Sequence, residues 1–509
     1  MNRAAGSPER GSPWEKTAKL PVRAPLSTSV DADVCVVGAG ISGLTTAYLL
    51  SREGRSVVVL DDGPAGGGMT RATTAHLTHA LDDRYFLLER VRGDEVSRVA
   101  AESHTVAIDR IESIAREASI DCEFARVDGY LFLSPHHGES LLDREEKAVH
   151  RAGLSRVERL PRSPLPFDTG PCLRFPNQAQ FHPLKYLNGV LKAFEDQGGR
   201  LYSGTHVDRV EGGAGARVWA GNHHVKAKNI VVATQTPIND LVKVHIKQFP
   251  YATYVIAAPV PKASVREGLY WDTEDPYHYV RLTPWSPDHD LLMVGGEDHK
   301  TGQAEDGVER FGRLEVWARE RFSMMEERTF NWSGEVMETL DGLAMIGRNP
   351  MDADNVFIIT GDSGMGMTHG TIAGMLLTDL ICDRPNPWAP AYDPSRKPVR
   401  AVGTFLKETA NMAAQYADWI EPGDVVSEDE IPSGQGAIMR VGLKKLAVYR
   451  DASGAVHRFS AVCTHLGCIV GWNAAASTWD CPCHGSRFDA MGKVVNGPAN
   501  RDLTSEDQG

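Results

Sequence analysis

The sequence predicts an α/β chain with a Rossmann-like dinucleotide-binding fold, followed by a small all-β module at the C-terminus. Two observations predict the first part: a strand, glycine turn, helix and strand over residues 33–63, and a strand, glycine loop and helix over residues 355–381. Short strands and paired Cys/His loops after residue 431 predict the second part. A chain of 509 residues exceeds one ordinary core, so two or three domains are expected.

Composition limits the classes of partner. The net charge is -13, and no segment concentrates the Lys and Arg that binding to phosphates requires, which argues against a nucleic-acid partner. No apolar run reaches the roughly 18 residues of a membrane span. Residues 1–30 form an N-terminal lead without an apolar run or a twin-arginine pair, and residues 1–11 are expected to be disordered. We therefore expect a cytoplasmic protein without a membrane span.

The glycine turn in "DVCVVGAGISGLTTAYLLSREGRSVVVLDDG" carries the first functional prediction. Its glycines have G-x-G-x-x-G spacing between a strand and a helix, so the backbone can approach a pyrophosphate at the helix N-terminus. Asp61 ends the second strand, where a carboxylate can bind ribose hydroxyls. The predicted contacts are Gly38, Gly40, Ile41, Ser42, Gly43 and Asp61.

Two later segments select the dinucleotide. "NIVVATQTP" (229–237) is a predicted buried strand that ends in a polar turn, and "NVFIITGDSGMGMTHGTIAGMLLTDLI" (355–381) is a predicted strand, glycine loop and helix. With the first turn, they resemble the glycine oxidase and D-amino-acid oxidase (DAO) family of FAD-dependent oxidoreductases. The resemblance implies FAD and an inserted α+β substrate domain. It divides residues 31–398 into FAD-binding pieces at about 31–83, 180–237 and 334–385, with substrate-domain pieces between them.

The resemblance also assigns FAD contacts outside the first turn. Gln235 stands where the family usually has Gly, and Arg71 has a solvated loop charge as its alternative. The helix after the glycine loop should face the pyrimidine end of the flavin, where its dipole would stabilise negative charge. The assigned contacts are Arg71, Thr73, Val207, Thr234, Gly361, Gly364, Met365, Gly366 and Met367.

Catalytic candidates come from the predicted substrate domain. Residues 84–118 have helical spacing, while "YATYVIAAPV" and "YHYVRL" are predicted strands. A period of two places Tyr277, Tyr279 and Arg281 on one face, where Arg could anchor a substrate carboxylate. The alternative is an exposed face of a half-buried strand.

Two further candidates rest on histidines. His299, followed by Lys300, lies in "VGGEDHKTG" and is a second catalytic candidate. His76 lies in "TTAHLTHAL", which resembles the segment where dimethylglycine dehydrogenases attach flavin covalently. The alternative for His76 is a pocket wall beside a non-covalent flavin.

The chain changes character after Pro398. Residues 399–430 are predicted as a helix and linker, and residues 431–509 as a small β domain. Cys463-x-His465 and Cys481-x-x-His484 are separated by fifteen residues. They supply two thiolates and two imidazoles, which suit a four-coordinate zinc ion or an iron–sulfur centre.

The rest of each loop favours the iron–sulfur centre. "CTHLGC" with "CPCHGS" resembles the Rieske [2Fe-2S] proteins of the cytochrome bc type. The resemblance implies that Cys463, His465, Cys481 and His484 bind the cluster, and that Cys468 and Cys483 form a disulfide. "NGPA" (496–499) matches the proline loop that covers the cluster in that family.

The two resemblances imply an FAD- and [2Fe-2S]-dependent dehydrogenase. It would oxidise an amine or amino-acid-like substrate by hydride transfer to FAD, and pass electrons through the cluster to an external acceptor. One alternative is a reductase component fed by NAD(P)H, but no second nucleotide-binding glycine motif follows residue 43. Another is an oxygen-using amine oxidase, although Met293 aligns with the Lys that activates oxygen in such relatives. A chain ending near Asp424 is expected to keep flavin reduction.

Overall fold

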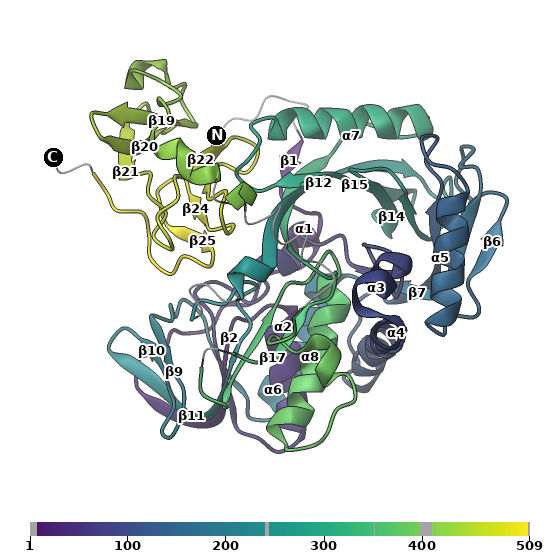
Figure 1. Ribbon diagram of the computed structural model, residues 1–509, viewed down its shortest axis with the longest axis horizontal. Helices are drawn as coiled ribbons and strands as arrows, with labels where there is room; N and C mark the ends of the chain where they lie inside the picture. The colour runs from purple at the N-terminus through teal and green to yellow at the C-terminus, as the bar shows by residue number, and fades with distance from the viewer. Residues whose placement is uncertain (1–7, 240–243, 351, 398–409, 413, 507–509) are drawn as a thin grey trace.

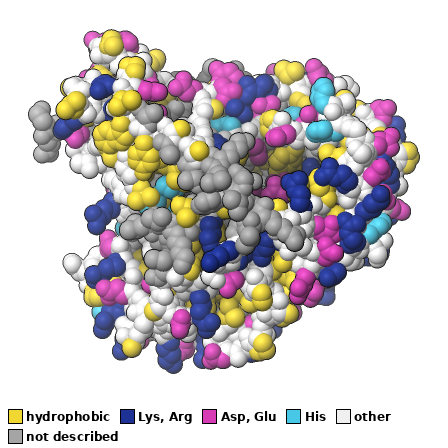
Figure 2. All heavy atoms as spheres, viewed as in Figure 1, with side chains coloured by type: hydrophobic (Ala, Val, Ile, Leu, Met, Phe, Trp, Pro, Cys, Tyr) yellow, Lys and Arg dark blue, Asp and Glu magenta, His cyan; other side chains and the backbone are white. Residues whose placement is uncertain are grey.

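The computed structural model describes residues 8–239, 244–350, 352–397, 410–412 and 414–506. Figure 1 shows a large domain built on two sheets and a small β domain at one side, drawn in green to yellow. On the face drawn in Figure 2, acidic and basic side chains are interspersed. Among the described residues, no helix has the length and apolar character needed to cross a membrane.

The first sheet of the large domain is the one that the glycine turn predicts. Its order is β17–β18–β11–β2–β3–β8, with β10 and β9 added beside β11. The strands from β18 to β8 are parallel, and their central residues are buried because helices cover them. The strands are β2 (Val30–Val37), β3 (Val57–Leu60), β8 (Arg200–Tyr202), β9 (Arg209–Glu211), β10 (Arg217–Ala220), β11 (His223–Val232), β17 (Met345–Arg348) and β18 (Val356–Thr360).

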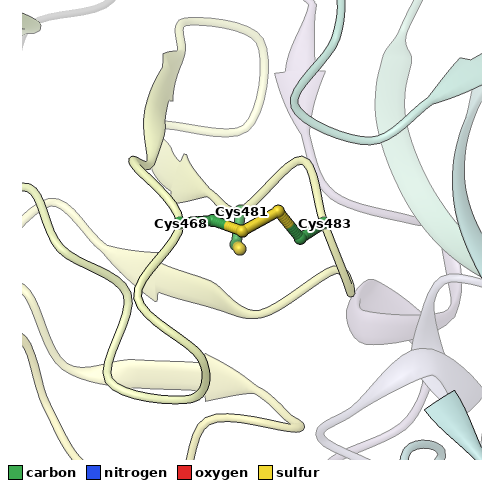
Figure 3. A group of neighbouring side chains, drawn as sticks. All are labelled: Cys468, Cys481 and Cys483. Atoms are coloured by element: carbon green, nitrogen blue, oxygen red, sulfur yellow. A yellow bond between two sulfur atoms is a disulfide. The ribbon is translucent and has the colours of Figure 1, made fainter. Parts of the chain in front are cut away.

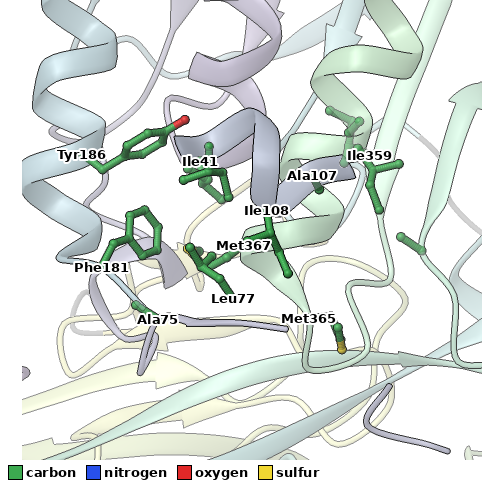
Figure 4. Packing of buried hydrophobic residues seen from close by; sticks show 14 of the residues in the cluster. Ile41, Ala75, Leu77, Ala107, Ile108, Phe181, Tyr186, Ile359, Met365 and Met367 are labelled. Carbon is green, nitrogen blue, oxygen red and sulfur yellow. The ribbon is translucent and has the colours of Figure 1, made fainter. Parts of the chain in front are cut away.

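Three helices pack together beside this sheet: α2 (Ile41–Arg52), α6 (Pro183–Asp196) and α8 (Gly366–Ile381). Helix α2 is buried on nearly every side because it lies between the other two. A Cβ on Gly374 of α8 would lie 2.8 Å from the Thr45 side chain of α2, so a glycine permits the close approach. Figure 4 shows side chains from these helices, such as Ile41, Tyr186 and Met367, converging in one core.

The second sheet has the order β1–β16–β12–β15–β14–β13–β5–β7–β4, with β6 paired to β7. Strands β12 and β14 confirm the two strands predicted in this region. The strands are β1 (Glu9–Arg10), β4 (His76–Leu77), β5 (Ala125–Phe132), β6 (Glu158–Leu160), β7 (Cys172–Gln180), β12 (Gln248–Pro261), β13 (Leu269–Asp272), β14 (His278–Pro284), β15 (His289–Lys300) and β16 (Phe330–Thr339).

Further helices complete the large domain. The helical spacing predicted over residues 84–118 is confirmed, as two helices divided at Gly93. Helix α7 packs on β12 and β15. The helices are α1 (Trp14–Thr17), α3 (Tyr85–Arg92), α4 (Asp94–Glu117), α5 (Ser140–Arg151), α7 (Gly307–Arg321) and α9 (Ala389–Tyr392), with 3-10 turns η1 (Met69–Arg71) and η2 (His245–Lys247).

The N-terminal lead departs from the prediction of disorder over residues 1–11. Residues 1–7 lie outside the described residues, but Glu9 and Arg10 form strand β1 on the edge of β16. The pairing uses main-chain bonds, with Glu9 N donating to Thr329 O at 2.7 Å and Gly11 N to Asn331 O at 3.1 Å. Because the strand is short and its side chains are polar, no hydrophobic alternation marked it in the sequence.

The C-terminal domain contains a three-stranded and a four-stranded antiparallel sheet. The predicted helix after residue 399 falls largely outside the described residues, which resume with helical residues 410–412. The elements are η4 (Gln415–Trp419), η5 (Glu428–Glu430), β19 (Gln435–Val441), β20 (Lys444–Arg450), β21 (Val456–Ser460), β22 (Gly471–Asn473), β23 (Thr478–Asp480), β24 (Arg487–Asp489) and β25 (Val494–Asn496).

Candidate functional site

A cavity of about 940 Å³ lies where the large domain meets the C-terminal domain. Its walls come from the glycine turn, residues 67–82, strands of both large-domain sheets, the loop before α8, and residues 493–502. A concave site of this size, assembled from several segments, suits a large ligand.

The glycine turn after β2 brings bare backbone to the cavity. Gly38 has a φ of +103°, and a Cβ there would lie 2.5 Å from Ala233 O. A Cβ on Gly43 would lie 1.9 Å from Gly38 O, so α2 can approach the turn only without a side chain at this position. Gly40 and Ser42 line the cavity at the start of α2, where N–H groups favour a phosphate. The turn therefore fits the pyrophosphate of a dinucleotide.

Asp61 lies at the cavity beside this turn. Its Oδ2 accepts a hydrogen bond from Ala39 N at 2.6 Å, and its Oδ1 accepts one from Gly63 N at 2.8 Å. Burial raises the pKa of Asp61 to about 6, against the lowering effect of these two bonds. A carboxyl fixed at the end of a parallel strand is suited to ribose hydroxyls.

Most of the other residues assigned to FAD also line the cavity, but Gly43 and Arg71 do not. Arg71 is 42% exposed at its side chain, and its Nη1 donates to Glu15 Oε1 at 2.9 Å. Arg71 therefore carries a solvated loop charge, as the alternative stated, and we withdraw Arg71 as an FAD contact. The residues that line the cavity are Ile41, Thr73, Val207, Thr234, Gly361, Gly364, Met365, Gly366 and Met367.

Gln235 replaces the expected glycine without losing the turn. It adopts a φ of +61°, the left-handed conformation that glycine would take, and its Nε2 donates to Glu335 O at 2.9 Å. Helix α8 begins nearby at Gly366, and its first residues line the cavity. The helix dipole therefore presents partial positive charge to this end of the site.

Strands β14 and β15 and residue Asp82 give the cavity an aromatic and acidic wall. The Tyr277 hydroxyl donates to Asp82 Oδ2 at 3.0 Å, and the Tyr279 hydroxyl lies 3.1 Å from Thr253 Oγ1. Burial raises the pKa of Asp298 to about 7. A carboxyl with this pKa can hold or release a proton near neutral pH.

The carboxyl groups in this wall were not predicted from the sequence. They lie on segments far apart in the chain, so no spacing connects them. Among the described lining residues, the lysines and arginines are Lys493 and Arg501, both from the C-terminal segment. Besides Asp82 and Asp298, unpredicted carboxyl groups from other segments line the cavity, among them Glu335 and Glu338 of β16 and Asp362 of the loop before α8.

Arg281 is placed differently from the prediction. It is 1% exposed and outside the cavity lining, which overturns the exposed-face alternative as well. Its Nη1 donates to Thr74 O at 2.7 Å and to Ala75 O at 2.9 Å, while burial lowers its pKa to about 9. Arg281 therefore holds the backbone that leads to His76, and we withdraw it as a carboxylate anchor.

The structure places one of the two histidine candidates at the cavity and the other away from it. His299 lies outside the cavity lining, with its Nε2 2.9 Å from the Tyr254 hydroxyl, so we withdraw it as a catalytic candidate. His76 lines the cavity beside Tyr279, with ring centroids 5.7 Å apart. Burial lowers the pKa of His76 to about 3, so its ring is neutral at ordinary pH.

The four predicted cluster ligands lie on two loops of matching shape. One loop joins β21 to β22 and the other joins β23 to β24. In the first, Gly467 N donates to Cys463 O, and in the second, Gly485 N donates to Cys481 O, both at 3.1 Å. Both glycines have positive φ, +81° and +79°. Each loop thereby presents one Cys and one His.

The side chains of these loops match the donor set of a Rieske cluster. The His465 and His484 rings meet edge to face, with centroids 5.0 Å apart. The Cys463 thiol faces that of Cys481, and this contact lowers the pKa of Cys463 and raises that of Cys481. Paired thiols beside paired imidazoles fit an iron–sulfur cluster with one Cys-bound and one His-bound iron.

A disulfide joins the two loops. Cys468 and Cys483 are bonded, with their Cα atoms 6.5 Å apart, as the resemblance implies (Figure 3). Their sulfurs and that of Cys481 lie within 4.8 Å of one another, but this trio is not a metal site because two of its sulfurs are bonded together. A zinc site would explain the four ligands and leave this second Cys pair without a reason.

The C-terminal domain is fastened to the large domain along the cavity. Asn496 donates to Glu335 Oε1 of β16, and Asn500 donates to Val207 O at 2.8 Å. A Cβ on Gly485 would lie 2.5 Å from the Pro250 side chain, so the second ligand loop rests directly on β12. Because residues 493–502 line the cavity, a chain ending near Asp424 would open the flavin site, contrary to our expectation for that variant.

Comparisons with known proteins agree with both halves. Residues 33–380 match the family model of the FAD dependent oxidoreductases, and residues 421–506 match that of the Rieske [2Fe-2S] domain. The chain is 32% identical over 498 residues to YhfW of Bacillus subtilis, which is named as a Rieske 2Fe-2S iron-sulfur protein, covering 97% of each chain. It is 26% identical over 374 residues to gamma-glutamylputrescine oxidoreductase of Escherichia coli, covering 70% of this chain and 85% of that one.

Solved structures share the fold of the large domain. Glycine oxidase from Geobacillus kaustophilus aligns with a TM-score of 0.60 at 18% identity, covering 72% of this chain and 100% of that one. L-proline dehydrogenase from P. horikoshii aligns with a TM-score of 0.59 at 16% identity, covering 72% and 98%.

Proposed function

This chain belongs to the FAD dependent oxidoreductase family and carries a C-terminal Rieske [2Fe-2S] domain, and from that premise we propose that it is an amine dehydrogenase. It oxidises a C–N bond of an amine or amino-acid-like substrate and passes the electrons through its own cluster to an external acceptor. The name of the Escherichia coli relative supports an amine substrate.

One observation carries the proposal: both domains line a single cavity. The turn that fits a dinucleotide and residues 493–502, which follow the second ligand loop, are walls of the same space. Electrons released at a flavin held there would have the cluster domain as their immediate neighbour.

Bound FAD would accept a hydride from the substrate, and a bound cluster would accept single electrons. Gly38, Gly40 and Asp61 would hold the nucleotide end of FAD, and the N-terminus of α8 would face the flavin ring. The cluster would be held by Cys463, His465, Cys481 and His484.

The substrate wall has the groups that amine oxidation needs. An alkylammonium ion must lose a proton before hydride can leave its α-carbon. Asp298, with its pKa raised to about 7 by burial, can accept that proton at the cavity wall. Tyr277 and Asp82 hold each other by a hydrogen bond and add a polar edge that can orient the amine.

The cavity gives little support to an oxygen-using oxidase. Met293 of β15 is buried in the hydrophobic core and does not line the cavity, so its alignment with the oxygen-activating Lys does not hold. The β15 residue at the cavity is Asp298, and a carboxylate does not stabilise the negative charge that oxygen acquires on reduction.

Anaerobic mixing tests the proposal. Protein carrying both cofactors is mixed with putrescine, sarcosine, L-proline or NADH, and flavin bleaching and cluster reduction are followed by absorbance and EPR. We expect at least one amine to bleach the flavin and then reduce the cluster, while NADH does neither. Bleaching by NADH alone would replace the proposal with the reductase function.

A further inference from the structure

We infer that His245 of the large domain is the contact that positions the two imidazole ligands of the cluster and through which electrons enter it. This inference rests on the proposed function, because it concerns the transfer from flavin to cluster. His245 belongs to η2, the short turn before β12, and it matches neither family motif in the sequence.

The placement of His245 carries the inference. Its ring centroid lies 5.0 Å from that of His465 and 6.0 Å from that of His484, and both pairs meet edge to face. His245 is 1% exposed and His484 is 3% exposed, so their contact is buried between the domains, while His465 is half-buried. Three imidazoles from two domains thus form one packed group, in which the large domain contacts both predicted ligands of one iron.

Packed groups also connect η2 to the flavin cavity. Thr360 and Gly361 line the cavity, and the Thr360 hydroxyl donates to Gln248 Oε1 at 2.9 Å. Gln248 is buried at the start of β12, directly after η2. The route from the cavity wall to the cluster ligands therefore runs through Gln248, one turn of backbone and His245.

The turn that carries His245 is anchored away from the C-terminal domain. Lys247 Nζ donates to Pro394 O at 2.8 Å and to Arg396 O at 3.0 Å. This anchoring fixes η2 to the large domain, so the position of His245 does not depend on the loops that it contacts. Groups packed against metal-bound histidines orient the rings and tune the metal.

The redox balance needs two passages along this route. A bound flavin, once reduced, would give up two electrons, and a bound cluster would accept one at a time, so the first electron would have to leave for an external one-electron acceptor before the second could follow. Protons of the reduced flavin go to water. No bond to His245 forms or breaks, so it is a positioning residue.

The test compares His245→Phe and His245→Ala with His289→Phe, which changes a surface histidine that hydrogen-bonds Glu326. Flavin in the anaerobic holoprotein is photoreduced by a light flash with EDTA as electron donor. Cluster reduction is then timed by circular dichroism, and the reduced cluster is examined by EPR. Phenylalanine keeps a ring in the packed group. The test therefore remains valid even where the alanine variant fails to bind its cluster.

We expect both His245 variants to slow cluster reduction about tenfold or more and to shift the EPR g-values, with flavin photoreduction unchanged. His289→Phe should match the wild type. A His245→Phe protein with the wild-type rate and spectrum would overturn the inference and leave the proposed function standing. A wild-type protein whose photoreduced flavin never reduces the cluster would instead overturn the proposed function.

Discussion

The cluster site and the flavin cavity are neighbours built in opposite ways. The cluster site uses two matching loops between Cys463 and Gly485, each closed by the same glycine hydrogen bond. The cavity gathers segments from Val37 to Asp502, mostly backbone and small side chains at strand ends. The cluster site depends on a few side-chain ligands carried by two adjacent loops. The cavity depends instead on the close approach of backbone segments from distant parts of the chain. The two sites should therefore fail separately and for different reasons.

The largest expected effect is at the cluster. Cys463→Ser removes one of four ligands, so the purified protein should lack nearly all cluster iron and sulfide. Flavin content should stay at the wild-type level, because Cys463 does not line the cavity. Iron, sulfide and flavin assays on the same preparation measure this. Loss of flavin along with iron would show that the two sites do not load independently.

The reciprocal change should empty the flavin site alone. In Gly43→Ala, the new Cβ would lie 1.9 Å from Gly38 O, so the turn must open and FAD binding should be lost. Gly312→Ala is the matched control, since a Cβ there meets no atom within 4 Å. Cluster EPR should be the same in both variants. Full flavin content in Gly43→Ala would contradict the tight approach.

Removing the disulfide should have a moderate effect confined to the cluster domain. The bond spans a sequence separation of 15 residues, and closing a loop of that size stabilises by about 3 kcal/mol. Cys468→Ser should therefore lower the unfolding temperature of the C-terminal domain and speed cluster loss, with flavin retained. Cys382→Ser, at a free cysteine, is the control. An equal loss of flavin and cluster would indicate one cooperative unit.

The smallest expected change, at most about 1.4 kcal/mol for each pH unit, is at the seam between the two sites. Burial raises the pKa of Glu335 to about 8 from 4.5, with Arg487 opposing the rise and Asp480 adding to it. The folded protein therefore holds a proton that the unfolded chain releases, and the stability from Glu335 is complete below about pH 4.5 and lost as the pH rises through 8.

Glu335→Gln should remove this pH dependence, because glutamine does not titrate. The free energy of unfolding of the wild type should therefore fall relative to that of the variant as the pH rises, by at most about 1.4 kcal/mol per pH unit. Calorimetry of both proteins across this range measures the difference, with Glu326→Gln as an exposed control. A difference in unfolding free energy between the two proteins that stayed constant from pH 5 to 8 would contradict the raised pKa of Glu335.

The same contrast explains what the sequence could predict. The ligands and the disulfide pair lie in two short motifs, and the glycine turn lies in one, so the spacing of these motifs and their resemblance to known families point to them. Asp298 and Glu338 are brought to the cavity by sheet register, which no local pattern records. Arg281 was misplaced because a period of two identifies a face of the strand but not what packs on it. His245 reaches the cluster across the domain interface, so no motif marks it.

Electrons are expected to pass from flavin to cluster inside one molecule, and the most direct test is to measure how the rate of that transfer depends on protein concentration. The flavin of the anaerobic holoprotein is reduced by a light flash, and cluster reduction is followed over a wide range of protein concentration. We predict a first-order rate constant that does not change with concentration. A rate that rises in proportion to protein concentration would contradict the claim, because the electrons would then be passing between molecules.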